Sequence, residues 1–151
     1  MPEKNLLAMN TTVLAFIGDA VYEVHVRNHV LNSGEASPEK LHRQAVGYVR
    51  AEAQAEALRL LIPELTPEEL ALVKRARNRK ITSKPKNADP IEYKMATAFE
   101  ALAGGLYLRQ DHERLQLLME RTLAIIDKLT AEKAAGLKSK ASIKSIINEI
   151  I

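Results

Sequence analysis

Two carboxylates stand alone in the most apolar stretches of the chain. Asp19 is the only charged residue in Leu14–Tyr22. Glu100 is the only charged residue in Met95–Leu108. An ionised carboxylate that is withdrawn from water is costly unless a cation, a metal ion or several hydrogen-bond donors compensate it. The pair therefore predicts a divalent metal site, and a structural role beside a buried cation is the alternative.

The elements that must bring these carboxylates together are predicted to be helices. Apolar residues recur at spacings of three and four, which is the pattern of an amphipathic helix. This pattern covers residues 11–31, 40–61, 68–79, 91–109 and 112–135. Cap residues followed by proline mark three helix starts, at Ser37-Pro38, Thr66-Pro67 and Asp89-Pro90. Strand patterns are absent, so we expect a single all-α domain with the two carboxylates on different helices.

The composition limits the class of protein. The chain has 151 residues and no cysteine, which excludes disulfides, thiolate zinc sites and a cysteine nucleophile. No uncharged stretch reaches the roughly 20 residues that span a bilayer, and no signal peptide is evident. We therefore expect a soluble, cytoplasmic protein without membrane contact.

Positive charge is concentrated in one segment, although the net charge is only +3. Between residues 74 and 94, eight basic residues face two acidic ones. The basic residues are Lys74, Arg75, Arg77, Arg79, Lys80, Lys84, Lys86 and Lys94. A positive field of this kind is suited to a polyanion, and the alternative is a solvated helix end followed by a loop.

The two apolar stretches resemble known motifs. Phe16–Val21 (FIGDAV) is similar to the signature of the ribonuclease III catalytic domain, and Phe99–Leu108 (FEALAGGLYL) is similar to its second acidic helix. The resemblance covers roughly residues 8–130. The short chain, without a double-stranded-RNA-binding domain, and the segments Arg75–Asn78 and Pro85–Asn87 resemble the Mini-ribonuclease III branch of that family in particular.

The resemblance implies a magnesium-dependent endoribonuclease that cleaves double-stranded RNA as a homodimer. In that branch the task is maturation of the 23S ribosomal RNA precursor. Asp19 and Glu100 are then the catalytic and metal-binding residues. The expected RNA contacts are Arg75, Arg77, Asn78, Lys80, Lys84 and Lys86. Phe16 and Ile17 are expected near the dimer interface, with plain core positions as the alternative.

Two positions depart from the larger ribonuclease III enzymes. Those enzymes place further carboxylates where this chain has Ala15 and Thr97, so the number of bound metal ions stays open. Glu23 lies on the same helix face as Asp19, at a spacing of four. It is expected either to contact the metal site directly or from a second shell, or to pair with Arg27 on the surface.

Three further features have both an ordinary and a functional interpretation. His25 and His29 have a zinc-compatible spacing, but no third ligand is evident, so we expect no zinc site. Gly104-Gly105 is costly within a helix, which predicts the close approach of another helix. Residues 136–151 form a basic amphipathic tail after the catalytic domain of residues 1–135. This tail is expected to pack on its own domain or to contact a partner or RNA.

A second class of function competes with the nuclease. The loss of two of the four acids of the larger enzymes is also compatible with a catalytically inactive helical RNA-binding or ribosome-assembly module. The presence of both Asp19 and Glu100 at their motif positions favours the enzyme.

Overall fold

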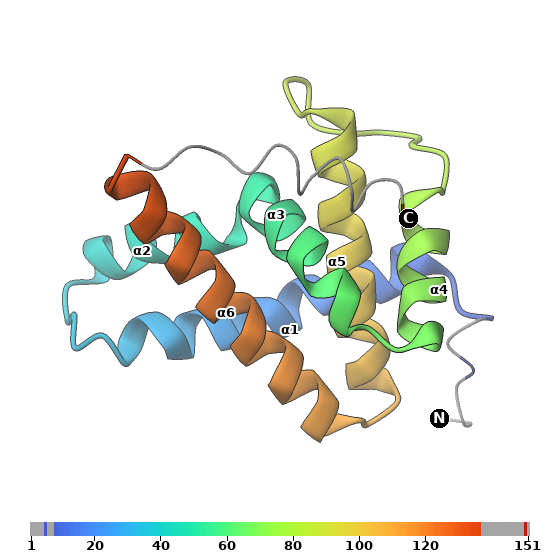
Figure 1. Cartoon of the computed structure of the whole chain (residues 1–151), viewed down its shortest axis with the longest axis horizontal. Coiled ribbons are helices and arrows are strands. Elements are labelled where there is room, and N and C mark those ends of the chain that lie inside the picture. Colours follow the sequence, from blue (N-terminus) through green and yellow to red (C-terminus); the bar gives the residue numbers. More distant parts are fainter. Residues whose placement is uncertain (1–4, 6–7, 137–149, 151) are drawn as a thin grey trace.

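The computed structural model describes residues 5, 8–136 and 150, and these residues form six α-helices and one short 3-10 helix (Figure 1). The elements are α1 (Thr11–Leu31), α2 (Pro38–Val49), α3 (Ala51–Leu61), η1 (Ile62–Glu64), α4 (Pro67–Arg77), α5 (Pro90–Leu108) and α6 (His112–Ala134). The described part of the chain contains no strand. The prediction of a single all-α domain is confirmed.

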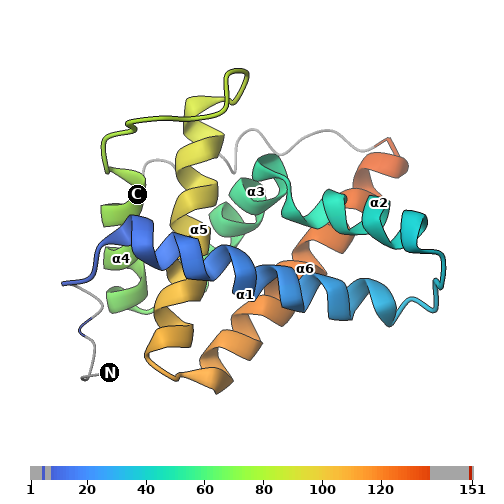
Figure 2. The ribbon, with the colours of Figure 1, turned by 180° about the vertical axis from the view of Figure 1, so that it is seen from behind.

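Helix α5 is the centre of the fold. Its residues from Ala101 to Leu106 are all buried, as expected of a helix that is apolar on every side. Helix α1 crosses one face of α5, whereas α3 and α4 pack against it from other directions (Figures 1 and 2). The ring edge of Tyr22 on α1 packs against Phe99 on α5, with 4.8 Å between the ring centroids. The helix that carries Glu100 is therefore held on several sides.

The prediction of one helix over residues 40–61 is wrong. The chain turns at Arg50, whose ψ of 149° is extended, so α2 ends at Val49 and α3 begins at Ala51. The side-chain amide of Gln54 donates to the Val49 carbonyl (2.8 Å), and its backbone N–H donates to the Arg50 carbonyl (3.2 Å). These bonds satisfy carbonyl groups at the break, where the apolar spacing continues without interruption.

The three helix starts marked by proline are confirmed, since each proline occupies the first position of its helix. The Asp89 carboxylate caps α5 by accepting a hydrogen bond from the Ile91 backbone N–H at 2.8 Å. Ser37 stands at the cap position of α2, but its side chain makes no cap bond there. At that start the proline alone marks the boundary, because it has no N–H to satisfy.

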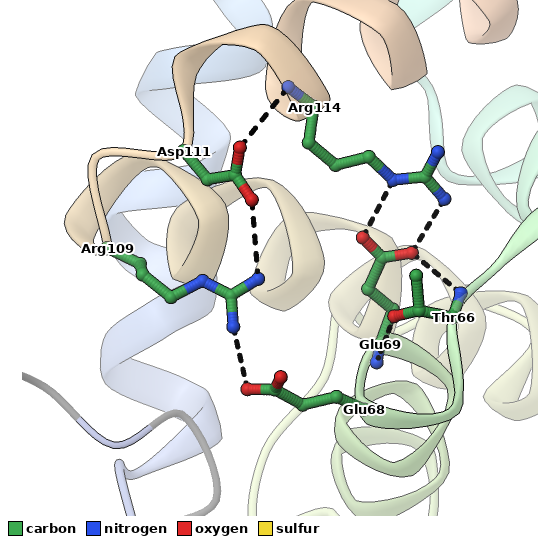
Figure 3. A network of polar contacts seen from close by, with 6 residues as sticks. All are labelled: Thr66, Glu68, Glu69, Arg109, Asp111 and Arg114. Atoms are coloured by element: carbon green, nitrogen blue, oxygen red, sulfur yellow. Dashed lines mark hydrogen bonds and ion pairs between the residues drawn. The ribbon is translucent and has the colours of Figure 1, made fainter.

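A buried carboxylate ties the start of α4 to α6 (Figure 3). Glu69 is 1% exposed and accepts two hydrogen bonds from the Arg114 guanidinium, at 2.9 and 2.7 Å. The Thr66 backbone N–H donates to the same carboxylate at 2.9 Å, and the Thr66 hydroxyl accepts from the Glu69 N–H, which completes a capping box. Beside it, Arg109 pairs with Glu68 at 2.7 Å. These bonds fix α4 against the turn between α5 and α6.

Two further expectations from the sequence concern a membrane-spanning helix and the C-terminal tail. None of the helices in the described residues is long and apolar enough to span a membrane. The basic amphipathic tail expected over residues 136–151 lies outside the described residues, except for Gly136 and Ile150. The boundary at residue 135 therefore stays a prediction.

Candidate active site

Helices α1 and α5 cross in contact at two glycines. A Cβ atom added at Gly18 would lie 1.7 Å from the Glu100 carbonyl oxygen. One added at Gly104 would lie 1.9 Å from the Leu14 carbonyl oxygen. Atoms cannot approach so closely, so this crossing requires glycine at both positions. The predicted close approach at Gly104 is confirmed, and it places Asp19, the residue after Gly18, beside Glu100.

The two carboxyl groups interact directly. Burial raises the pKa of Glu100 to about 8, together with its hydrogen bond to Asp19 and the negative charge of Asp19. Glu100 is half-buried, whereas Asp19 is exposed, so the pair is open to solvent on one side. Two carboxyl groups this close cannot both ionise at low cost unless a cation lies between them. A bound cation would therefore stabilise this arrangement.

The donor set of the site is compatible with a hydrated divalent metal ion. The described residues contain no group of three or more Asp, Glu or His side chains that could enclose a metal ion. Mg²⁺ prefers oxygen ligands and keeps several of its waters, so two carboxylates are a sufficient protein contribution. The raised pKa of Glu100 results from burial beside a negative group, which a divalent ion would offset.

The other acid predicted near the site, Glu23, pairs with a residue of its own helix. Glu23 accepts a hydrogen bond from the Arg27 guanidinium at 3.0 Å, which is the surface ion pair given as the alternative. The two positions where larger enzymes carry acids contribute no charge. Ala15 is buried, and the Thr97 hydroxyl donates to the Tyr93 carbonyl of its own helix at 2.9 Å. The carboxylate pair thus has no third acid from these positions.

The two histidines with zinc-compatible spacing have different neighbours. His29 bonds to the Asp127 carboxylate at 2.9 Å and packs its ring edge-on to Tyr48. His25 lies beside α6, where burial lowers its pKa and Glu120 opposes that shift. With no metal-type cluster in the described residues, the structure gives no support to a zinc site here.

The basic segment lies at the end of α4 and in the following loop, which Figure 1 shows as a long excursion between α4 and α5. Lys80, Lys84 and Lys86 are exposed. The Lys84 ammonium donates to the Ala88 carbonyl at 3.2 Å, which folds the loop back on itself. The Arg77 guanidinium donates to the Asn78 side chain at 3.2 and 3.0 Å. These groups form a solvent-facing basic surface.

Two arginines of the same segment face the protein. The Arg75 guanidinium is half-buried and donates to the Met9 carbonyl at 2.5 Å. The Arg79 guanidinium donates to the Asn10 side-chain oxygen at 2.9 Å. Both contacts join the end of α4 to the start of α1. They were not predicted from the sequence, because the partners are 66 and 69 residues distant in the chain.

The outer face of α1 is apolar and exposed. Phe16 is 82% exposed, which rules out a plain core position, and Val13 and Val24 are 53% and 60% exposed. Ile17, in contrast, packs in part against the core. A groove of about 360 Å³ lies beside this face. It is lined by Ile17, Ala20, Val21, Val24, His25, Tyr107, His112, Leu115 and Gln116.

Comparisons with known proteins agree with this architecture. The ribonuclease III domain family matches residues 12–111, a span that contains both carboxylates and the basic segment. The chain is 49% identical over 118 residues to Mini-ribonuclease 3 of Brevibacillus brevis, covering 78% of this chain and 88% of that protein. It is 44% identical over 124 residues to Mini-ribonuclease 3 of Symbiobacterium thermophilum, covering 82% and 95%.

A solved structure shares the fold as well. The crystal structure of a Fusobacterium nucleatum protein matches with a TM-score of 0.71 at 30% identity, covering 80% of this chain and 97% of that one. The chain belongs to the ribonuclease III family. Its similarity to curated Mini-ribonuclease 3 proteins extends over most of its length, and the resemblance inferred from the two motifs is confirmed.

Proposed function

We propose that this chain is a magnesium-dependent endoribonuclease that cleaves double-stranded RNA as a homodimer. Membership of the ribonuclease III family supports the nuclease activity. The observation that carries the proposal is the contact between Asp19 and Glu100; burial, together with this contact, raises the pKa of Glu100 to about 8. Each acid comes from one of the two family motifs, and their meeting at the helix crossing creates a site that a divalent ion would stabilise.

The two carboxylates have distinct tasks in this proposal. A bound divalent ion supplies a water that is made nucleophilic and neutralises charge on the reacting phosphate. Asp19, on the exposed side, would hold the ion where solvent and RNA can reach it. Glu100 is half-buried and would be the second ligand, and it must lose its proton to serve as one. The glycines of the helix crossing keep these two groups at a fixed separation.

We assign RNA binding to the basic surface at the end of α4. Lys80, Lys84 and Lys86 are exposed and can contact phosphates, with Arg77 and Asn78 at the base of the loop. The deep and narrow major groove of A-form RNA is not read by side chains, so shape and phosphate contacts dominate. Replacing all three lysines with glutamine should therefore weaken duplex binding across sequences and reduce its salt dependence.

The exposed face of α1 is proposed to bind a second copy of the chain. A duplex has two strands, and a twofold dimer presents one carboxylate pair to each strand. Phe16 is the most exposed of the large apolar side chains described, and the next residue, Ile17, lines the 360 Å³ groove. Covering this face would remove from water the most exposed aromatic side chain of the described residues.

Sedimentation tests the dimer. The wild-type protein should have about twice the chain mass of 16.8 kDa at micromolar concentration. Phe16→Glu should give a monomer, because a charge would be buried in the interface. Ile91→Glu is the matched control, since Ile91 is 59% exposed but lies on α5 outside this face. A wild-type monomer that cuts both strands would contradict the proposed dimer.

The biological substrate is proposed to be the precursor of 23S ribosomal RNA, which also places the protein in the cytoplasm. Support comes from the similarity to Mini-ribonuclease 3 proteins over most of both chains. The competing proposal is an inactive RNA-binding or ribosome-assembly module, which is favoured by the absence of acids at Ala15 and Thr97.

One assay separates the two proposals. Long duplex RNA and the same strand in single-stranded form are incubated with the protein, with Mg²⁺ or with a chelator. We expect the protein to cleave the duplex in Mg²⁺ but not in the chelator. It should cleave the single strand little. Tight duplex binding without cleavage in Mg²⁺ or Mn²⁺ would support the inactive module instead.

A further inference from the structure

Helix α4 connects two parts of the molecule, and each of its ends is held by arginine contacts. At its start, Arg114 of α6 clamps Glu69. At its end, Arg75 and Arg79 reach the segment that begins α1. Figure 2 shows the start of α1 lying beside α4. The start of α1 is thus attached to an element that is itself fixed to the body of the domain.

The group bound by Arg79 is the cap of α1. The Asn10 side-chain oxygen accepts from the Thr12 backbone N–H at 2.8 Å, as an N-cap does, and it accepts from the Arg79 guanidinium at 2.9 Å. One residue earlier, the Met9 carbonyl accepts from Arg75. Two neighbouring groups directly before the first turn are therefore held by Arg75, on α4, and Arg79, just beyond its end.

The place of this turn determines the place of Asp19. A helix rises about 1.5 Å per residue, so Asn10 lies about 14 Å from Asp19 along one rigid element. Between them, the Leu14 carbonyl packs on Gly104, with no side chain at the glycine to absorb a displacement. A tilt at the start of α1 would change the packing at the crossing, and with it the separation of Asp19 from Glu100.

We propose that Arg75 and Arg79 are positioning residues, which fix the first turn of α1 so that Asp19 lies against Glu100. This inference rests on the proposed nuclease function. It changes the role expected for Arg75 from a phosphate contact to a contact within the protein. The lysines of the same segment keep the role of phosphate contacts, because Lys80, Lys84 and Lys86 are exposed residues.

The kinetic test compares three variants, each of which removes one positive charge. Arg75→Gln and Arg79→Gln should each lower kcat about tenfold, the scale expected of a small misplacement of reacting groups. Their affinity for duplex RNA and its salt dependence should stay within about twofold of the wild-type values. Lys86→Gln is the matched control: it should raise KM, leave kcat unchanged and reduce the salt slope by about one. Arg75→Lys, which keeps a donor and the charge, should recover part of the lost kcat.

A second readout does not depend on activity. In the metal-free protein, hydrogen exchange of the backbone N–H groups of residues 14–17 should be faster in Arg75→Gln and Arg79→Gln, with exchange in α5 unchanged. Asn10→Ala should have the same effect. The double variant Asn10→Ala with Arg79→Gln should increase exchange by less than the sum of the two single effects.

The outcomes distinguish this inference from the proposed function. Weaker RNA binding with a lower salt slope in Arg75→Gln and Arg79→Gln, as in Lys86→Gln, would overturn the inference and make both arginines phosphate contacts. Unchanged exchange in the first turn of α1 would also overturn it. A wild-type protein that cleaves no duplex would instead defeat the proposed nuclease, and the exchange result would still decide whether the arginines hold α1.

Discussion

Two glutamates that are wholly or partly buried in this molecule have opposite electrostatic surroundings. Glu69, between α4 and α6, accepts two hydrogen bonds from Arg114 and one from the Thr66 backbone. Burial alone would raise the pKa of Glu69, but these bonds outweigh burial and hold the pKa below its usual range. Glu100, between α1 and α5, faces the carboxyl group of Asp19, and its pKa is raised to about 8.

The difference separates a structural carboxylate from one that is available for a ligand. The hydrogen-bonding capacity of Glu69 is used within the protein, so its charge stabilises the fold. Among the described residues, no ion pair of Glu100 or Asp19 is found, and burial beside the negative charge of Asp19 destabilises the ionised form of Glu100. A cation that binds between Glu100 and Asp19 would supply to them what Arg114 supplies to Glu69.

The largest expected effect is on catalysis, from neutralising the pair at the helix crossing. Asp19→Asn and Glu100→Gln should each lower the cleavage rate about 100-fold or more, because the ion loses a charged ligand. The effects should not add, since both residues act on one ion. The measurement is single-turnover cleavage of duplex RNA beside RNA affinity and thermal melting. Full activity in either stable variant would rule out the assigned site.

The next effect is on stability, from neutralising the other glutamate. Glu69→Gln leaves the Arg114 guanidinium without its charged partner and should lower the free energy of unfolding by about 3 kcal/mol. Cleavage per folded molecule should not change. Glu64→Gln is the control, because it removes the exposed ion pair with Arg121 and should cost much less. Equal stability of the two variants in urea unfolding would show that Glu69 is not the main tie of α4.

The two glutamates are expected to affect the pH dependence of stability with opposite sign. Glu100 binds its proton more tightly in the folded state, so without metal the folded protein should lose stability as the pH rises from 4.5 to 8. Glu69 has a lowered pKa, so its contribution is present above the unfolded pKa and is lost as the pH falls below it. Urea unfolding of Glu100→Gln should show a flatter profile between pH 4.5 and 8. An unchanged profile would mean that Glu100 does not titrate there.

Much of the site could be predicted from the sequence, because its chemistry is local to two motifs. Asp19 and Glu100 each stand out as a lone charge in an apolar helix, and Gly104 indicates a close helix approach. The same reasoning identified the exposed lysines as a basic surface. It also left Phe16 undecided between core and interface, since an apolar residue on a buried helix and one on an exposed face have the same spacing.

What the sequence did not predict depends on contacts between distant segments. The turn at Arg50 interrupts an apolar pattern that continues across it, so periodicity alone indicates one helix. In the sequence, Arg75 and Arg79 are part of a run of positive charge, and nothing there indicates their contacts with the start of α1. The bond between Glu69 and Arg114 was not predicted either, because the two residues are 45 positions apart in the chain.

The central claim is that the carboxylates of α1 and α5 form a metal site in which Glu100 must give up a proton. Titration calorimetry of the metal-free protein with Mg²⁺, in two buffers of different ionisation enthalpy at about pH 7, measures this directly. We expect release of about one proton per ion bound, because Glu100 is mostly protonated at this pH in the metal-free protein. Glu100→Gln should bind the ion more weakly and release no proton. Binding without proton release, or equal affinity in Glu100→Gln, would contradict it.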